Sequence, residues 1–390
     1  MTAMRAWCIA DGGLWLMEGE APARQIESAF VAEATARAEK GRRLEGWKTA
    51  PREDYQGIIP ANMLWGGRQG GKDSPPPRFR HAVRGLDADS IYYMIDLHGS
   101  SGLFHYKPSE NKETRLFHHA QYRSHGMAFD ADREAIIVSF ENRDGTAYLA
   151  VYDKDGTSKG SITGGDAMDT QPSCSQREKG VVWFQSAGIA RHPQTGRAVA
   201  LGPSVINRLD YANGKLDTIL EDRQFDFLAP REDRQGNLYY IRRPYERAGQ
   251  QSPTSFLKDI FLLPWRLAKA IFGYLNFFSM IYGREPLRSA GGPAGNPLEQ
   301  DLGSLWLHGR MIQAANVPRE ESQGLVPASW QLRKRTRQGE DALVADHIVS
   351  FDLAGDGSLF YSNGFEVFHI LRNEPTSRKH PGIIESVSAA

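Results

Sequence analysis

A weak repeat recurs six times along the chain and constrains its fold more than any other feature of the sequence. Each copy has a short first strand, a turn of Asp, Glu or Gly residues, and a run of three or four apolar or aromatic residues. Turn residues allow the chain to reverse, and the β-branched or aromatic run supplies the next strand. Each copy therefore predicts a β-hairpin. The copies begin at Met4, Gly85, Phe129, Pro172, Pro230 and Phe351.

Two further strands usually follow each hairpin, which gives four short strands in a unit of roughly 45 residues. After the strand at 136–139 come a turn at 142–145, a strand at 148–152 and a turn at 153–156. Four antiparallel strands per unit are typical of a β-propeller blade. We expect an all-β protein, a single six-bladed β-propeller over residues 1–380, with seven blades as an alternative. The N-terminal strands should complete the ring beside the strand at 365–370, and residues 381–390 should form a flexible tail.

One copy carries a family resemblance. The segment Asp169-Thr-Gln-Pro-Ser-Cys-Ser175, followed by Gly180-Val-Val-Trp-Phe184, resembles the TolB-like, WD40-like β-propeller repeat of bacteria. The resemblance extends over most of residues 4–375, apart from two insertions. It departs from the family where Glu178-Lys-Gly180 and Arg234-Gln-Gly236 replace the usual Asp-Gly turn. The resemblance implies a propeller fold and a protein-binding role, and it supplies no catalytic residues.

Two insertions interrupt the repeat, and strand order predicts that both project from one face. If strands A to D are counted outward, the B–C and D–A turns share a face because antiparallel neighbours alternate in direction. The first insertion (21–58) follows a B strand at 14–17, and the next strand is expected at 62–65. The second (245–302) follows a B strand at 238–242, and the next strand is expected at 304–308. Short turns would serve the fold, so extra chain at equivalent corners favours a binding role for this face.

The first insertion is expected to form a helix. It is rich in Ala, Glu, Lys and Arg, and Ile26, Phe30, Ala34 and Ala38 fall at helical spacing. This spacing gives the helix a one-sided apolar stripe. The stripe would pack against its own propeller or dock onto a partner.

The second insertion contains the most apolar stretch of the chain, residues 256–282. As a helix it would carry Lys258, Asp259, Arg266 and Lys269 on one side and apolar residues on the other. Four charges argue against a membrane-spanning helix, whereas an amphipathic element fits a membrane surface, a protein partner or its own propeller. The candidate contact residues are Phe256, Leu257, Ile260, Phe261, Leu263, Trp265, Leu267, Ile271, Phe272, Phe277, Phe278 and Met280.

Four polar residues occupy a similar register, ahead of the B strands of their units. They are His125, Asp169, Asp226 and His347. This register places them near the start of the innermost strands, around one mouth of the propeller's central channel. Imidazoles and carboxylates that converge there could bind a cation or a polar peptide group. They could equally be turn residues that satisfy backbone donors.

The sequence carries no pattern that specifies a catalytic, metal or cofactor site. There is no Gly-x-Ser-x-Gly elbow and no His-Glu-x-x-His helix. The loop 66–72 has the glycine and lysine spacing of a phosphate-binding loop, but Asp73 replaces the Ser or Thr that would bind magnesium. We therefore expect no catalytic residue, no metal ligand set and no cofactor. A metal-dependent, lactonase-like hydrolase with its site at the channel mouth is the alternative.

Charge and cysteine content narrow the partners and the compartment. Lys plus Arg and Asp plus Glu both total 47, so the net charge is zero and no specific nucleic-acid partner is expected. Two cysteines, Cys8 and Cys174, are too few for a disulfide framework and favour a reducing compartment. Residues 1–20 lack the apolar core of an export signal. We expect a cytoplasmic scaffold that binds a protein partner in a bacterial complex, with peripheral contact to the inner membrane as a further option.

Overall fold

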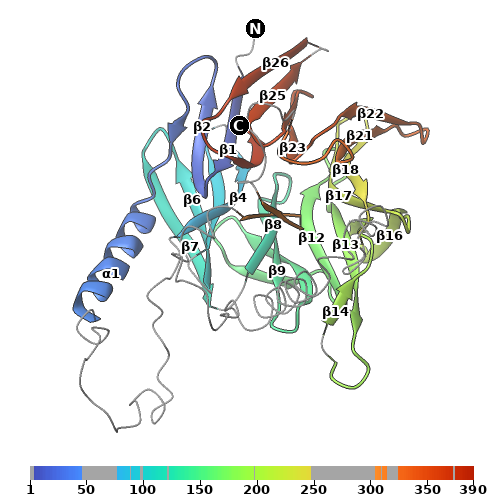
Figure 1. Ribbon diagram of the computed structural model, residues 1–390, viewed down its shortest axis with the longest axis horizontal. Helices are drawn as coiled ribbons and strands as arrows, with labels where there is room; N and C mark the ends of the chain where they lie inside the picture. The colour runs from blue at the N-terminus through green and yellow to red at the C-terminus, as the bar shows by residue number, and fades with distance from the viewer. Residues whose placement is uncertain are drawn as a thin grey trace, which may run out of the picture.

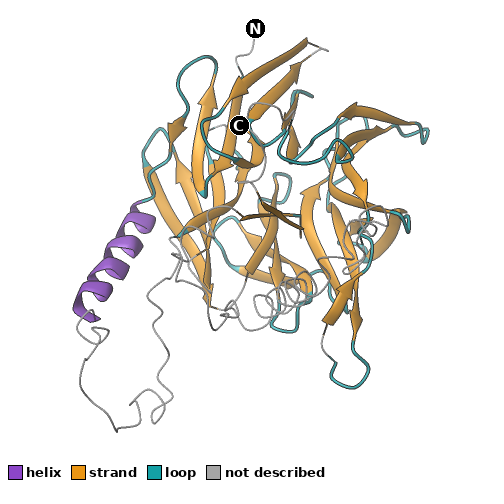
Figure 2. Ribbon diagram, viewed as in Figure 1, coloured by secondary structure: helices purple, strands orange, loops and turns teal. Residues whose placement is uncertain are grey.

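The computed structural model describes residues 4–45, 77–87, 89–96, 100–120, 123–196, 198–246, 304–308, 310–313, 324–371 and 374–390. These residues form an all-β structure whose strands are accompanied by one helix, α1 (Ala29–Glu45). The sheets stand around a common centre, and α1 projects away from them (Figures 1 and 2). The expectation of an all-β protein is confirmed.

Most strands pair into antiparallel groups of four, numbered here from the N-terminus. The first group has the order β27 (Ile384–Ala389), β1 (Arg5–Ala10), β2 (Gly13–Glu18), β3 (Arg24–Gln25). The second group is β4 (Arg78–Arg84), β5 (Ile91–Asp96), β6 (Ser100–Lys107), β7 (Lys112–Ala120). The third group is β8 (Arg123–Asp130), β9 (Ala135–Glu141), β10 (Ala147–Asp153), β11 (Ser158–Ser161).

The remaining groups follow the same pattern. The fourth group is β12 (Ala167–Cys174), β13 (Val181–Arg191), β15 (Val205–Asp210), β16 (Lys215–Leu220), and β14 (Ala198–Leu201) pairs with the far end of β13. The fifth group is β17 (Phe225–Glu232), β18 (Leu238–Pro244), β21 (Gln331–Arg335), β22 (Asp341–Ala345). The sixth group is β23 (Ser350–Leu353), β24 (Leu359–Ser362), β25 (Glu366–Leu371), β26 (Glu374–Lys379). One parallel pair, Ala147 with Met168, joins the third and fourth groups into a single sheet.

The first strands of the groups contact one another in cyclic order. The order is β27, β4, β8, β12, β17 and β23, and β23 returns to contact β27. Strand β27 also pairs with β1, from Ala6 opposite Ala389 to Ala10 opposite Ile384. The two ends of the chain therefore meet in one sheet beside the sixth group. The expected tail at 381–390 is wrong, because Ile384 and Val387 are buried and make these residues an inner strand.

The apolar core lies between neighbouring sheets rather than in one central mass. Successive residues of a strand point to opposite faces of its sheet, and here both faces are covered. In β5, Tyr93 packs toward the first group and the next residue, Met94, packs toward the third. Both side chains are fully buried. This explains why second strands such as β5 and β9 are nearly continuous apolar runs.

Strand β27, which closes the ring, changes the corner of the first group at which the first insertion leaves. Because β27 is the innermost strand of its group, β3 is the fourth strand, and α1 follows it at a D–A corner rather than at a B–C corner. Both kinds of corner lie on the same face, so this insertion keeps the expected face. Ile26 is buried and the Phe30 ring lies 4.9 Å from the Phe104 ring, so the start of the helix packs on its own sheets. Residues 46–58 and the strand expected at 62–65 lie outside the described residues.

The second insertion leaves the fifth group after its second strand, as expected. The third strand of that group is β21, which pairs with β18 from Leu238–Arg335 to Arg242–Gln331. The prediction that residues 304–308 form the third strand of this group is therefore wrong. Residues 304–313 instead contain a separate hairpin of β19 (Ser304–Leu307) and β20 (Arg310–Gln313). A short apolar run predicts a strand but does not identify its pairing partner.

The candidate contact residues of the apolar stretch, from Phe256 to Met280, lie outside the described residues. Within the described ranges, no helix has the length and apolar character needed to cross a membrane.

Candidate functional site

The four residues of the expected channel mouth lie near the starts of four inner strands. His125 is in β8, Asp169 in β12 and Asp226 in β17, and His347 comes just before β23. The D–A connections lead into these strands, so the four residues lie toward the face that carries the insertions. Each of the four is bonded to its own partner, and the partners differ.

Asp226 forms a buried ion pair with an arginine that sequence reasoning did not single out. Arg243, at the end of β18, donates from Nε to Asp226 Oδ2 at 2.9 Å, and both side chains are buried. The backbone N–H of Ser204 donates to Asp226 Oδ1 at 3.0 Å. The Arg243 guanidinium also lies over the buried Trp330 ring, 4.6 Å from its centroid. A buried charge pair of this kind depends on both partners.

Asp169 is buried among hydroxyl groups. Ser186 donates to Asp169 Oδ1 at 2.7 Å, and Ser139 donates to the Asp169 main-chain carbonyl at 2.6 Å. Burial raises the pKa of the Asp169 carboxyl, while hydrogen bonds from Ser186 and Thr163 lower it. The net result is a carboxyl that resists ionisation.

The two histidines of the set contact groups of their own neighbourhood. His125 Nε2 lies 2.7 Å from Glu141 Oε2 on the adjacent strand β9. His347 Nδ1 lies 2.7 Å from the carbonyl oxygen of Val326. Because a carbonyl only accepts, Nδ1 of His347 carries the proton. His125 therefore connects β8 to β9, and His347 connects the chain before β23 to the segment before β21.

Two further histidines, His81 in β4 and His308 in the turn between β19 and β20, belong to the same region. His81 Nε2 donates to the Ser124 carbonyl at 3.1 Å, and His308 Nε2 donates to the Val349 carbonyl at 3.0 Å. Burial lowers the pKa of each imidazole to about 4. His308 was missed because its segment had been assigned to a blade strand, and Arg243 because only the fold places it against Asp226.

The chemistry of this region is that of buried, mutually bonded polar groups. In the part of the chain that the structure describes, no group of three His, Cys, Asp or Glu residues is placed to hold a metal ion. Burial raises the pKa of the Cys8 thiol to about 12 and also raises that of Cys174, which disfavours a thiolate nucleophile. The polar side chains bond to each other and to main-chain carbonyls.

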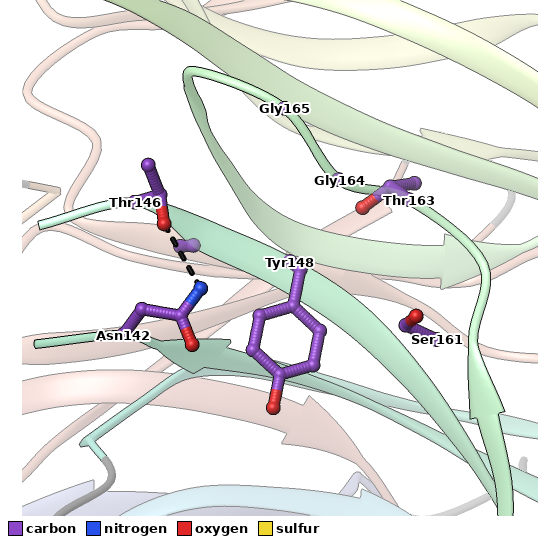
Figure 3. Close-up of a pocket in the computed structure, with 8 residues that line it drawn as sticks. Asn142, Thr146, Tyr148, Ser161, Thr163, Gly164 and Gly165 are labelled. Atoms are coloured by element: carbon purple, nitrogen blue, oxygen red, sulfur yellow. Dashed lines mark hydrogen bonds between the residues drawn. The ribbon is translucent and has the colours of Figure 1, made fainter. Parts of the chain in front are cut away.

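A shallow pocket of about 280 Å³ opens beside these residues, on the third group (Figure 3). Its side chains are uncharged, and the Asn142 amide donates to Thr146 Oγ1 at 2.9 Å in its lining. Thr163 in its wall also bonds to Asp169, which connects the pocket to the channel mouth. Its lining residues are Asn142, Thr146, Ala147, Tyr148, Ser161, Thr163, Gly164 and Gly165.

Comparison with known proteins identifies the fold. No family model matches the sequence, and no curated protein matches it. TolB from Acinetobacter baumannii superposes with a TM-score of 0.51 at 8% identity, over 99% of this chain and 66% of that one. A chain of the nidogen/laminin complex gives a TM-score of 0.50 at 7% identity, over 100% of this chain and 98% of that one. The tricorn protease gives a TM-score of 0.42 at 11% identity, over 96% of this chain and 34% of that one.

The protein therefore has a TolB-like β-propeller fold, as its repeat indicates. It spans just under two-thirds of the TolB chain. At such low sequence identity the likeness concerns the fold alone.

Proposed function

We propose that this protein is a six-bladed β-propeller that acts as a non-enzymatic scaffold for a protein partner. The six groups of four strands would be its blades, and the cyclic contacts of their first strands support a closed ring. The partner would bind to the face that carries the D–A and B–C corners. This proposal rests mainly on one observation, which is that the long additions to the fold all leave from corners of that face.

Three additions share this face. Helix α1 leaves at the D–A corner after β3, and the chain after β18 leaves at the B–C corner of the fifth group. The third addition is the β13–β14 hairpin, which lies at the B–C corner of the fourth group. Figure 1 shows α1 and this hairpin projecting toward the same, lower side of the molecule.

The β13–β14 hairpin has a turn held by polar contacts and exposed apolar side chains. Arg191, at the turn end of β13, donates from Nε to Asp166 Oδ1 at 2.6 Å and from Nη1 to the Gly196 carbonyl at 3.1 Å. On the opposite strand Val199 is 37% exposed and Leu201 is 41% exposed. Val199 and Leu201 alternate along β14 and so share one face of the hairpin, which gives a protein partner an exposed apolar surface to cover.

The polar residues of the channel mouth support a non-enzymatic role. The Asp226 carboxylate is paired with Arg243, and the imidazoles of His81 and His308 donate to main-chain carbonyls. A general base or a nucleophile needs a neighbouring group that activates it toward substrate. The observed bonds serve the packing of the ring instead.

The proposal also covers the kind of partner and the cellular compartment. One of the similar structures is a nidogen/laminin complex, which is an assembly of proteins. For this chain we propose a protein partner in a cytoplasmic, multi-subunit complex. The apolar stretch 256–282 would dock onto that partner or onto the inner surface of the membrane.

The hairpin provides the sharpest test. The full-length protein and a Val199→Asp, Leu201→Asp double variant are purified by affinity tag from the native cell, and associated proteins are quantified. Leu343→Asp is the matched control, because Leu343 is 54% exposed on β22, away from the hairpin. We expect a stoichiometric partner with the wild type and the control that is lost with the double variant, while thermal unfolding is unchanged. Equal recovery from all three proteins, or no stoichiometric partner at all, would reject the proposed surface.

A further inference from the structure

The tip of the β19–β20 hairpin lies at the centre of the ring. The His308 ring donates to Val349, which precedes β23, and Arg243 Nη2 on β18 donates to the His308 carbonyl at 2.9 Å. The charge of His308 also acts on His81, which lies on β4, the inner strand opposite β17 in the cyclic order. A residue can lie close to β18 and to β4 at once only if it is near the axis of the ring. Figure 1 shows the hairpin as short, unlabelled strands in dark orange near the centre.

The tip is held by a bond that requires a proton on Nε2 of His308. Because the Val349 carbonyl only accepts, Nε2 carries the proton of the neutral ring and Nδ1 carries a lone pair. Nδ1 is buried and has no hydrogen-bond partner within the described residues. A second proton on the ring would therefore be a buried donor without an acceptor, which is a costly arrangement.

The charges that face His308 make this cost larger. Arg243 on β18 and Arg231 on β17 are cations, and His81 on β4 would repel an imidazolium if it were itself protonated. The Asp226 carboxylate on β17 is already paired with Arg243 Nε. The chain just before β23 contributes the neutral Val349 carbonyl. Burial and the two guanidinium groups lower the pKa of His308, whereas the hydrogen bond to the Val349 carbonyl raises it. The lowering effects are the larger ones, so the site favours the neutral ring.

We propose that this hairpin tip is an acid-released plug, which closes the centre of the ring while His308 is neutral and withdraws when His308 is protonated. The inference depends on the propeller fold and is independent of the scaffold role. Its consequence is that a ligand would reach the axis from this face only after the tip has moved.

The expected size of the effect follows from the two states of the ring. Burial, Arg243 and Arg231 hold the pKa of His308 at about 4 in place, whereas a withdrawn imidazole returns to about 6.5. Withdrawal is therefore favoured progressively as the pH falls from about 6.5 toward 4. Between pH 7 and pH 5 the equilibrium constant for withdrawal should rise about twentyfold.

Hydrogen exchange measured by mass spectrometry on the full-length protein tests this inference. Exchange of the amides of residues 304–313 is followed at pH 7, 6 and 5 and corrected for the intrinsic pH dependence of exchange. We expect their protection to fall about twentyfold in the wild type, while the amides of β12 stay protected. Protection of 304–313 that is constant from pH 7 to 5, or that falls together with that of β12, would overturn the proposal.

Three substitutions assign the effect to one residue. His308→Gln keeps an N–H donor for Val349 but does not titrate, so its protection should be independent of pH. His81→Gln and the exposed His192→Gln should both keep the wild-type pH dependence of the hairpin. If His81→Gln, rather than His308→Gln, abolishes that dependence, the role of His308 is wrong. If His308→Gln does not fold, the wild type and His81→Gln still decide the question.

Discussion

At the scale of single residues, the centre of this protein is organised by buried polar groups that depend on one another. Arg243 contacts Asp226, the His308 carbonyl and the Trp330 ring at once, and so joins β17, β18, the β19–β20 turn and the chain before β21. Loss of one partner from a buried ion pair leaves the other charge uncompensated. These residues therefore matter more for stability than their polar character suggests.

The ion pair leads to a first prediction. Asp226→Asn removes the negative charge and leaves the Arg243 guanidinium buried without it, so the free energy of unfolding should fall by about 3–5 kcal/mol. Chemical denaturation followed by tryptophan fluorescence measures this change. Asp155→Asn, at an exposed turn, is the control and should change stability by less than about 0.5 kcal/mol. An equal effect of both variants would show that the pair contributes nothing specific.

A second prediction concerns His81 and pH. Burial lowers the pKa of folded His81 to about 4, whereas the unfolded chain has an ordinary value near 6.5. The unfolded state therefore binds the proton first, and stability falls as the pH drops below about 6.5. From pH 7 to pH 5 this group should account for a loss of about 2 kcal/mol. Chemical denaturation of the wild type and of His81→Gln at pH 7, 6 and 5 measures this loss. The stability of His81→Gln should fall less with pH than that of the wild type. Equal slopes for the two proteins would show that His81 plays no part.

At the scale of elements, α1 shows how a projecting helix is attached at one end. Its N-cap, Ser28, accepts from the Val31 N–H at 3.1 Å and donates to Glu113 Oε1 at 2.5 Å. The other oxygen of Glu113 accepts from the Phe30 N–H at 3.1 Å. A carboxylate at a helix N-terminus also complements the helix dipole. The helix is thus anchored to β7 through its first turn.

The third prediction follows from that anchor. Ser28→Ala removes the cap, so the first turn of α1 should fray at a cost of about 1 kcal/mol. Hydrogen exchange of residues 29–34 should speed up by about fivefold to tenfold, while exchange in β7 stays unchanged. Thr35→Ala lies in the same helix away from the cap and serves as the control. If Thr35→Ala loosened the first turn as much, the cap would not be the anchor.

At the scale of the whole molecule, the last strand pairs with the first, and the fifth group continues across the longest insertion. Strand β27 pairs with β1 and contacts the inner strands β4 and β23. By contrast, β18 and β21 pair directly with each other on either side of the second insertion. Closure therefore rests on a short terminal segment.

The fourth prediction compares two deletions. Removal of residues 384–390 should expose the edge of β1 and the apolar faces beside it, so the protein should become insoluble or lose its cooperative thermal transition. Removal of residues 250–300 should leave a cooperative transition within a few degrees of the wild type. Circular dichroism melting of both proteins measures this. A soluble, cooperatively folded chain without residues 384–390 would disprove the closing role of β27.

Local turn chemistry explains why much of the fold could be anticipated. The Asp-Lys-Asp-Gly turn at 153–156 and the apolar run of β9 act over a few residues, and both are where the sequence indicates. The register of Asp169 and Asp226 likewise followed from equivalent positions in the repeat. Residues 384–389 and 304–313 were misassigned because their partners, β1 and the centre of the ring, are far away in the sequence.

The sequence by itself determined the all-β class, the hairpin repeat and the face from which the long insertions leave. These depend on turn residues, strand alternation and strand count, which are local properties of the chain. Only the tertiary structure decided how the ring closes, which buried groups pair at its centre and where the tip of the β19–β20 hairpin lies. Those features are contacts between residues distant in sequence, and such contacts become specific only when the sheets have packed against one another.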